Sequence, residues 1–189
     1  MNELDLLDWK RRVFGLYAEV RASDPHVGWE RWRDVRAELF RDHPQSPSPG
    51  YTKLAYFDYD PSLRFLADVD PVEAQPIEID GFPFRRFAVA RFELGTLDLY
   101  WLEGYGGGVF LPFADATRGT ETYGAGRYLL DTVKGADLGT ADGRLVLDFN
   151  FAYNPSCSYD PGWVCPLSPP ANRLPLAIRA GEQHRSAAA

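Results

Sequence analysis

The spacing of apolar residues changes near residue 43, and this change most limits the folds open to the chain. Before it, apolar residues recur every three or four positions, as on one face of an α-helix. After it, they alternate with polar residues, as in a strand with one buried face. The segment between the two patterns, HPQSPSPG at 43–50, is rich in proline and typical of a connector. The pattern predicts helices first and strands afterwards.

Two amphipathic helices are expected within residues 1–42, an N-terminal helical arm. The first is predicted over 3–21 from its single apolar stripe. The second begins at Pro25, with Asp24 as its cap, because proline suits the first helical position. It ends near Asp42, since the next residue precedes a proline and avoids helical backbone angles. The two helices can form an antiparallel hairpin or lie along a sheet.

The alternating pattern predicts seven or eight short strands within a β-rich domain at 43–182. A strand, a turn at 58–62 and a second strand come first, and a meander with a turn at Asp80-Gly81 follows. A later strand, GRLVLDFNF, should place Phe149 and Phe151 on one face. The predicted fold class is α+β, mainly β: an antiparallel β-barrel or two-sheet roll with two N-terminal helices.

The segment 150–182 holds six prolines and both cysteines of the chain, so it resembles a flexible tail at first sight. Disordered tails are poor in aromatic and aliphatic residues. This segment instead carries Tyr159, Trp163, Leu174 and Ile178 among others. We therefore expect an ordered, proline-rich wrap over the sheet, followed by a disordered tail at 183–189.

Charge and composition disfavour several classes of protein. The net charge is −7 and basic residues are scattered, which disfavours nucleic acid as a partner. No run of about 18 apolar residues is present, so no membrane helix is expected. The N-terminus lacks the basic-then-apolar order of a secretion signal, which favours the cytoplasm. With three histidines and two cysteines, we expect no metal site and no cofactor. Cys157 and Cys165 are expected to be free thiols in a reducing compartment.

Four stretches of the sequence resemble one protein family. They are HPQSP at 43–47, YFDYDPSLRF at 56–65, LPFADATRGTETYGAGRYL at 111–129, and the long DFNFAYNPSCSYDPGWVCPLSPPANRLPLAIRAGE at 148–182. The pattern is similar to a bacterial and archaeal family known only as domain-of-unknown-function family 1684. The resemblance extends over most of the chain from the second helix onward, and it implies kinship without implying an activity.

Arg127 is the first residue of the predicted ligand-binding set. It follows two glycines in YGAGRYL, and its guanidinium can hold a carboxylate or phosphate through two N–H groups. An internal salt bridge, to Asp115 or Asp131, accounts equally well for it. The stretch lacks the lysine and spacing of a phosphate-binding loop.

The rest of the set lies where the last predicted strand meets the proline-rich wrap. Asp148 and Asn150 share one face of that strand, and can hold a polar ligand or bond to loop amides. Tyr153 and Asn154 start the wrap, and would line a pocket if the wrap closes one mouth of a barrel. Asn154 can equally well satisfy backbone groups of the loop itself.

Three residues are candidates for catalysis, each with a plainer alternative. His43 is a potential general base or a residue that ends a helix. Asp148 is a potential acid–base group or a buried, fully bonded carboxylate. Cys157 is a potential nucleophile if its pKa is lowered, or half of a redox-active thiol pair, but a free cysteine is more often a small buried apolar residue.

Two functions follow from the sequence, and it leaves open whether the protein is an enzyme. The first is a barrel that binds a small, anionic molecule, with acid–base or hydrolytic chemistry if it is an enzyme. The second is a non-catalytic protein that associates, for example as a homodimer, through the helical arm or a sheet edge. The three tryptophans of the arm suggest the second, since two short helices need less apolar surface than they provide.

Overall fold

The computed structural model describes residues 2–184 and confirms the mainly β fold class. The chain begins with the helices α1 (Glu3–Ala22) and α2 (Pro25–Asp42). The side chains of Asn2 and Asp24 cap them by accepting hydrogen bonds from amides of the first turn. Both helices therefore lie where their apolar stripes predicted them, and Asp24 caps α2 as expected.

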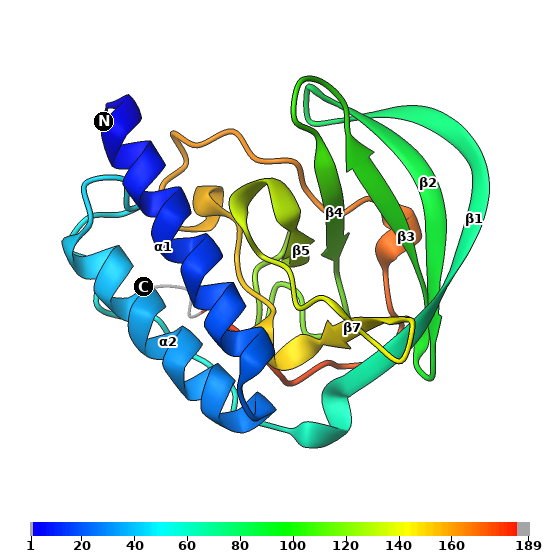
Figure 1. Ribbon diagram of the computed structural model, residues 1–189, viewed down its shortest axis with the longest axis horizontal. Helices are drawn as coiled ribbons and strands as arrows, with labels where there is room; N and C mark the ends of the chain where they lie inside the picture. The colour runs from blue at the N-terminus through cyan, green and yellow to red at the C-terminus, as the bar shows by residue number, and fades with distance from the viewer. Residues whose placement is uncertain (1, 185–189) are drawn as a thin grey trace.

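Seven strands form one antiparallel sheet in the order β5-β4-β3-β2-β1-β7-β6. The predicted barrel or roll takes the form of this single sheet, which curls into a half-barrel beside the helical pair (Figure 1). The strands are β1 (Arg64–Ile79), β2 (Phe82–Phe92), β3 (Gly95–Leu102), β4 (Gly108–Phe113), β5 (Arg127–Asp131), β6 (Thr140–Ala141) and β7 (Arg144–Asp148).

Local turn chemistry explains the longest hairpin. Asp80 and Gly81 both have positive φ angles, of 50° and 83°, and they join β1 to β2 where Ile79 pairs with Phe82. Such a two-residue turn matches the twist of the strands on either side. The strand expected before residue 58 does not form, and Tyr56 makes only an isolated bridge with Glu182. Its partner lies in the C-terminal segment, which a local pattern cannot show.

The last strand ends earlier than its alternating pattern predicted. β7 stops at Asp148, whose carboxylate accepts from the amide of Asn150 and starts a 3-10 turn at Phe149–Phe151. In this turn, side chains two positions apart no longer share one face, as they would in a strand. Phe149 therefore joins the interior of the half-barrel and Phe151 joins the cluster under the helices, so the prediction of a shared face was wrong.

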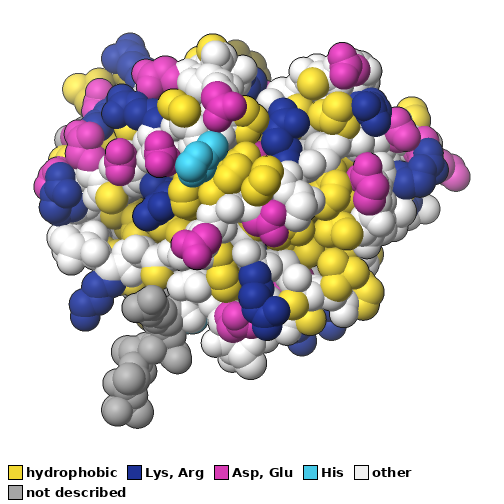
Figure 2. All heavy atoms as spheres, turned by 90° about the horizontal axis from the view of Figure 1, so that it is seen from below, with side chains coloured by type: hydrophobic (Ala, Val, Ile, Leu, Met, Phe, Trp, Pro, Cys, Tyr) yellow, Lys and Arg dark blue, Asp and Glu magenta, His cyan; other side chains and the backbone are white. Residues whose placement is uncertain are grey.

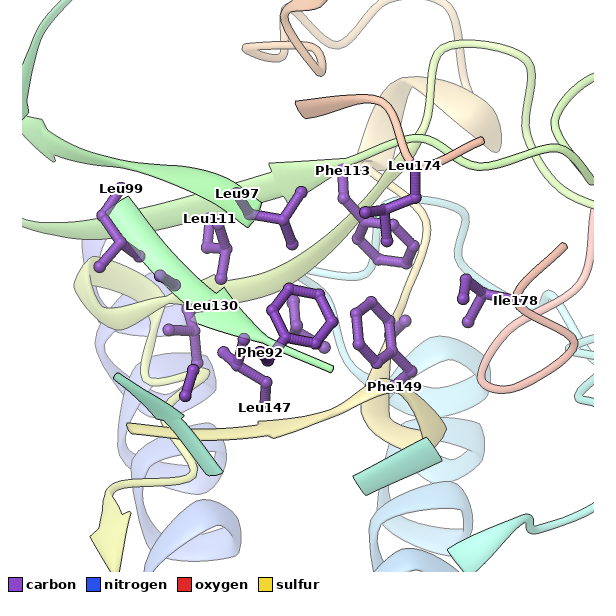
Figure 3. Close-up of a cluster of buried hydrophobic side chains, with 14 of the residues drawn as sticks. Phe92, Leu97, Leu99, Leu111, Phe113, Leu130, Leu147, Phe149, Leu174 and Ile178 are labelled. Carbon is purple, nitrogen blue, oxygen red and sulfur yellow. The ribbon is translucent and has the colours of Figure 1, made fainter. Parts of the chain in front are cut away.

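Apolar side chains fill the interior of the half-barrel. Strand residues such as Leu97, Leu111 and Leu147 meet Phe149, and the C-terminal segment adds Ile178 (Figure 3). The short side chains of alanines on β1 and β2 leave room for the rings. The interior is thus a packed core of the kind expected in small barrels.

The helices cover one side of the curled sheet. Tyr17, Trp29 and Trp32 are buried together with Val146 of β7 and Phe151. This packing buries Trp29 and Trp32, two of the three tryptophans of the arm.

The proline-rich wrap is ordered, as predicted. Ala114 and Arg173 form a parallel bridge, and the amide of Ile178 donates to Asp115 at 3.3 Å. Gly181 has a φ of 74°, and a Cβ there would lie 2.6 Å from the carbonyl oxygen of Ala152, so only glycine fits this close approach. The predicted tail at 183–189 lies outside the described residues except for 183 and 184, whose amides donate to carbonyl groups of residues 55 and 121.

Charged side chains of both signs lie next to one another on the face shown in Figure 2, with hydrophobic side chains between them. Neither sign forms a continuous field on that face. Within residues 2–184, no helix combines the length and the apolar character that crossing a membrane requires.

Candidate functional site

A pocket lies between the two helices and the chain that follows β7, and we call it the aromatic pocket. It is lined by α1, α2, β5, the segment 153–159 and the residues Pro47, Lys134 and Ala136. Its cavity volume is about 80 Å³. Aliphatic side chains such as Val13 and Leu39 complete the lining. Its ring side chains are Trp9, Tyr17, Trp32, Phe40, Tyr128, Tyr153 and Tyr159.

One backbone bridge fixes the wall opposite the helices. Tyr128 on β5 and Tyr153 exchange two hydrogen bonds, with N···O distances of 2.8 and 3.1 Å. β5 is one end of the sheet order, and Tyr153 follows β7 near the other end. The bridge therefore draws the two ends of the curled sheet together and sets the start of the wrap against the helices.

Two tyrosine hydroxyl groups, those of Tyr17 and Tyr153, are donors in the pocket. Tyr17 Oη accepts from Trp32 Nε1 at 3.1 Å, and within residues 2–184 its own proton has no acceptor. The hydroxyl of the half-buried Tyr153 bonds no protein atom in the same range. Burial raises the pKa of both phenols, so both stay protonated at neutral pH. Each can donate a hydrogen bond to a guest.

A buried ion pair stiffens the wall between α2 and the wrap. Arg36 Nη2 donates to Glu182 Oε2 at 2.9 Å, and the amide of Asn154 donates to the same oxygen at 3.0 Å. The Tyr159 hydroxyl donates to Glu182 Oε1. Burial alone would lower the pKa of Arg36, but the Glu182 carboxylate, followed by Tyr56, raises it well above its usual value. Arg36 is therefore charged, and its charge is already matched.

Lys134 supplies positive charge at the rim. It lines the pocket, its side chain is 58% exposed, and its Nζ lies 3.5 Å from Asp131 Oδ2. Burial raises the pKa of Asp131 above its usual value, and the Lys134 charge offsets part of that rise. An anionic group at the rim would meet a cation held only by this long contact.

The structure brings two residues of the predicted ligand set into this pocket. Tyr153 and Asn154 both line it. The Asn154 amide nitrogen donates to the carbonyl of Gln183 at 3.1 Å, whereas its side-chain oxygen is buried without a partner among residues 2–184.

Arg127 lies elsewhere, and protein atoms satisfy it. Its Nη2 donates to Asp115 at 2.8 Å and to the carbonyl of Ile178 at 3.0 Å, and its Nη1 donates to the carbonyl of Ala180. The side chain is 1% exposed. Arg127 therefore anchors the C-terminal wrap, and its salt-bridge partner is Asp115.

Asp148 and Asn150 lie at the end of β7 and do not line the aromatic pocket. Asn150 donates to Asp148 Oδ1 at 2.8 Å and also bonds the backbone of Asp60. Asp148 Oδ2 is buried without a hydrogen-bond partner among residues 2–184, and Arg64 Nε lies 3.7 Å away. Burial raises the pKa of Asp148 to about 6. This carboxyl lines a groove with Arg64 and Arg21, separate from the aromatic pocket.

His43 and Cys157 have separate surroundings. The His43 ring is buried, with Nε2 3.2 Å from Asp8 and Nδ1 accepting from the amide of Gln45 at 3.0 Å. Cys157 and Cys165 are free thiols. Burial, followed by the neighbouring Cys165 sulfur, raises the pKa of Cys157 to about 11, which disfavours the reactive thiolate.

Arg36, Glu182 and Tyr17 are the important residues that sequence reasoning missed. Arg36 lies seven positions after Trp29 and four after Trp32, so it shares the buried stripe of α2. A charged residue on an apolar stripe was a usable signal for a buried pair. Glu182 ends the AIRAGE stretch, and its partner 146 positions earlier is visible only in the fold.

Comparison with known proteins places the chain in a family. By structure, the protein is a curled half-barrel sheet with two N-terminal helices and an aromatic pocket between them. The family described as "Protein of unknown function (DUF1684)" matches residues 49–183, so the chain belongs to that family, and the resemblance seen in its motifs is confirmed.

A solved structure supports the same fold. The solution NMR structure of an uncharacterised protein from Haloarcula marismortui is 34% identical, with a TM-score of 0.57. The match covers 80% of this chain and 89% of that one. No curated protein matches the chain.

Proposed function

We propose that the protein binds a small molecule in the aromatic pocket, with its apolar, ring-sized body against the side chains and one anionic end. One observation carries the proposal: a ring-lined cavity contains two phenol hydroxyls, of Tyr17 and Tyr153, whose protons have no acceptor among residues 2–184. Ligand pockets combine apolar walls with a few such placed polar groups.

The nature of the polar groups selects the ligand. Because the pKa values of the two phenols are raised, both stay neutral and can donate hydrogen bonds. Lys134 adds a cation at the rim. A carboxylate satisfies both features because it is acceptor-only and negative. The Arg36–Glu182 pair is neutral overall, so it neither favours nor opposes an anionic guest.

Binding is proposed here ahead of catalysis. The carboxyl suited to acid–base work, Asp148 with its pKa of about 6, lines a different groove. His43 and Cys157 are bonded or deactivated in their own surroundings. Acid–base or hydrolytic chemistry would require a substrate that reaches the Asp148 groove instead.

Benzoate is a suitable probe, because it joins one ring to one carboxylate. We expect it to bind the native protein saturably in a calorimetric titration. Tyr17→Phe and Tyr153→Phe should each weaken binding about tenfold, the worth of one hydrogen bond to a charged group. Tyr105→Phe, at a fully exposed ring, is the matched control and should leave the affinity unchanged. Equal affinity in all variants would refute the proposal.

Association through the helical arm is the second candidate. Leu4, Leu7 and Phe14 are 75%, 41% and 47% exposed, all on α1. Deleting the arm is a poor test, because its helices share a buried cluster with β7. Replacing Leu4 and Leu7 with serine should instead reduce the mass measured by light scattering if a homodimer forms there. An unchanged mass would remove this candidate.

A further inference from the structure

Arg33 on α2 is a half-buried arginine without an acceptor. Within residues 2–184 it makes no hydrogen bond and no ion pair, and its Nε is shielded from solvent. Other half-buried arginines are matched: Arg36 bonds Glu182 at 2.9 Å, and Arg12 bonds Glu38 at 2.6 Å. The cost falls on Nε, because a buried N–H without a partner has lost its hydrogen bond to water.

Two rings hold the Arg33 guanidinium in place. Its central carbon lies 4.4 Å from the ring centre of Trp29 and 5.1 Å from that of Tyr56. Stacking on aromatic faces stabilises a guanidinium and fixes its plane. Tyr56 is itself held, since its hydroxyl accepts from Arg36 Nε at 3.4 Å. The donors of Arg33 are therefore preorganised, while their acceptors are missing.

The guanidinium lines a groove between α2 and the connector. Arg33, Ala37 and Arg41 follow one another at spacings of four, so they share one helix face. Tyr51 and Thr52 line the opposite side, and the cavity volume is about 170 Å³. The small side chain of Ala37 leaves space between the two arginines. The groove shares none of its lining residues with the aromatic pocket.

The charges facing the groove leave Arg33 as its unmatched cation. Arg41 is held by Asp42, with a shortest N···O distance of 2.7 Å. Asp34 also lines the groove and opposes an anion, but it forms no ion pair with Arg33 within residues 2–184. The hydroxyl of Tyr51 adds a donor that bonds no protein atom in that range.

We infer that this groove binds an oxyanion, a carboxylate or a phosphate, through the planar guanidinium of Arg33. The fork of N–H groups on arginine matches the geometry of two oxygens on such an anion. The inference does not depend on the function proposed for the aromatic pocket.

The direct test follows the Arg33 Nε–H resonance by NMR during titration of the native protein with inorganic phosphate, and separately with acetate. We expect that resonance to shift saturably with one probe or both. Saturation with phosphate alone assigns a phosphate site, and saturation with acetate alone assigns a carboxylate site. Absence of a saturable shift with either probe overturns the inference, and this reading requires no variant.

Substitutions sharpen the test. Arg33→Lys keeps the charge but loses the planar fork, so the affinity should fall about tenfold. Arg33→Gln should abolish saturable binding. Arg11→Gln, at an exposed residue on α1, is the control and should bind as the native protein does. Unchanged affinity in Arg33→Gln would show that the anion binds elsewhere.

Discussion

The interior of the half-barrel and the interface beneath the helices are built from one chain in opposite ways. The interior joins Leu97, Leu111 and Phe149 with small alanines, and the buried ion pair of Arg127 and Asp115 borders it at the ring of Phe113. The interface joins Tyr17, Trp32 and the segment around Tyr153, and it contains hydroxyl groups, an ion pair and a cavity.

The difference teaches where binding should occur. A dry, close-packed interior offers neither space nor specific donors. An interface of large rings and polar groups packs less completely, and tyrosine and tryptophan combine apolar area with a donor. Recognition is therefore expected at the boundary with the helices.

Breaking the ion pair should have the largest effect. Glu182→Ala removes the carboxylate that matches Arg36 and leaves a buried, unmatched cation. We expect the free energy of unfolding to fall by about 3–5 kcal/mol, measured by urea denaturation. Glu121→Ala, which breaks an exposed pair with Arg179, is the control and should change little. A small loss in Glu182→Ala would mean that water solvates Arg36 and that the wall is open.

Truncating one leucine in each region tests the comparison itself. Leu111→Ala should lower the free energy of unfolding by about 2–5 kcal/mol, because the packed interior cannot collapse into the cavity that the substitution leaves. Leu16→Ala should cost less, since Leu16 already borders a cavity. Equal losses in thermal denaturation would argue that both regions are packed alike.

Asp148 predicts a pH effect. Its pKa is raised to about 6 in the folded protein, so the folded state binds the proton more tightly than the unfolded state. Its contribution to stability is therefore present below about pH 4 and is lost as the pH rises through 6. Asp148→Asn should remove this slope and raise the stability at pH 7 by about 2 kcal/mol. Parallel stability–pH curves for the two proteins would contradict it.

The smallest stability effect is expected for Tyr153→Phe. Its hydroxyl bonds no residue among 2–184, so the free energy of unfolding should change by no more than about 0.5 kcal/mol. Tyr159→Phe removes a bond to the Glu182 carboxylate and should cost about 1–3 kcal/mol. If Tyr153→Phe costs as much as Tyr159→Phe in the same denaturation series, its hydroxyl has a structural partner after all.

Local signals in the sequence were enough for the elements. Helical spacing with Asp24 and Pro25 located α2, and Asp80-Gly81 located the longest hairpin, because each signal acts within a few residues. The aromatic and aliphatic residues of the segment 150–182 were enough to predict that the proline-rich wrap is ordered. Compartment, partners and catalysis stay predictions.

The pocket could not be predicted because long-range contacts assemble it. Tyr17 and Tyr153 come from opposite ends of the chain, and Arg36 meets Glu182 only when the wrap reaches α2. Asp148 and Asn150 were expected to neighbour each other, and they do, but through a 3-10 turn that alternation does not encode.

A benzoate titration followed by NMR tests the central claim most directly, since it reports on both regions at once. The indole N–H of Trp32 and the methyl groups of Val13 should shift saturably, because both residues line the aromatic pocket. The methyl groups of Leu111, Leu129 and Leu147 should stay fixed, because they fill the half-barrel. Saturable shifts confined to those three leucines, or no saturable shift anywhere, would contradict the account.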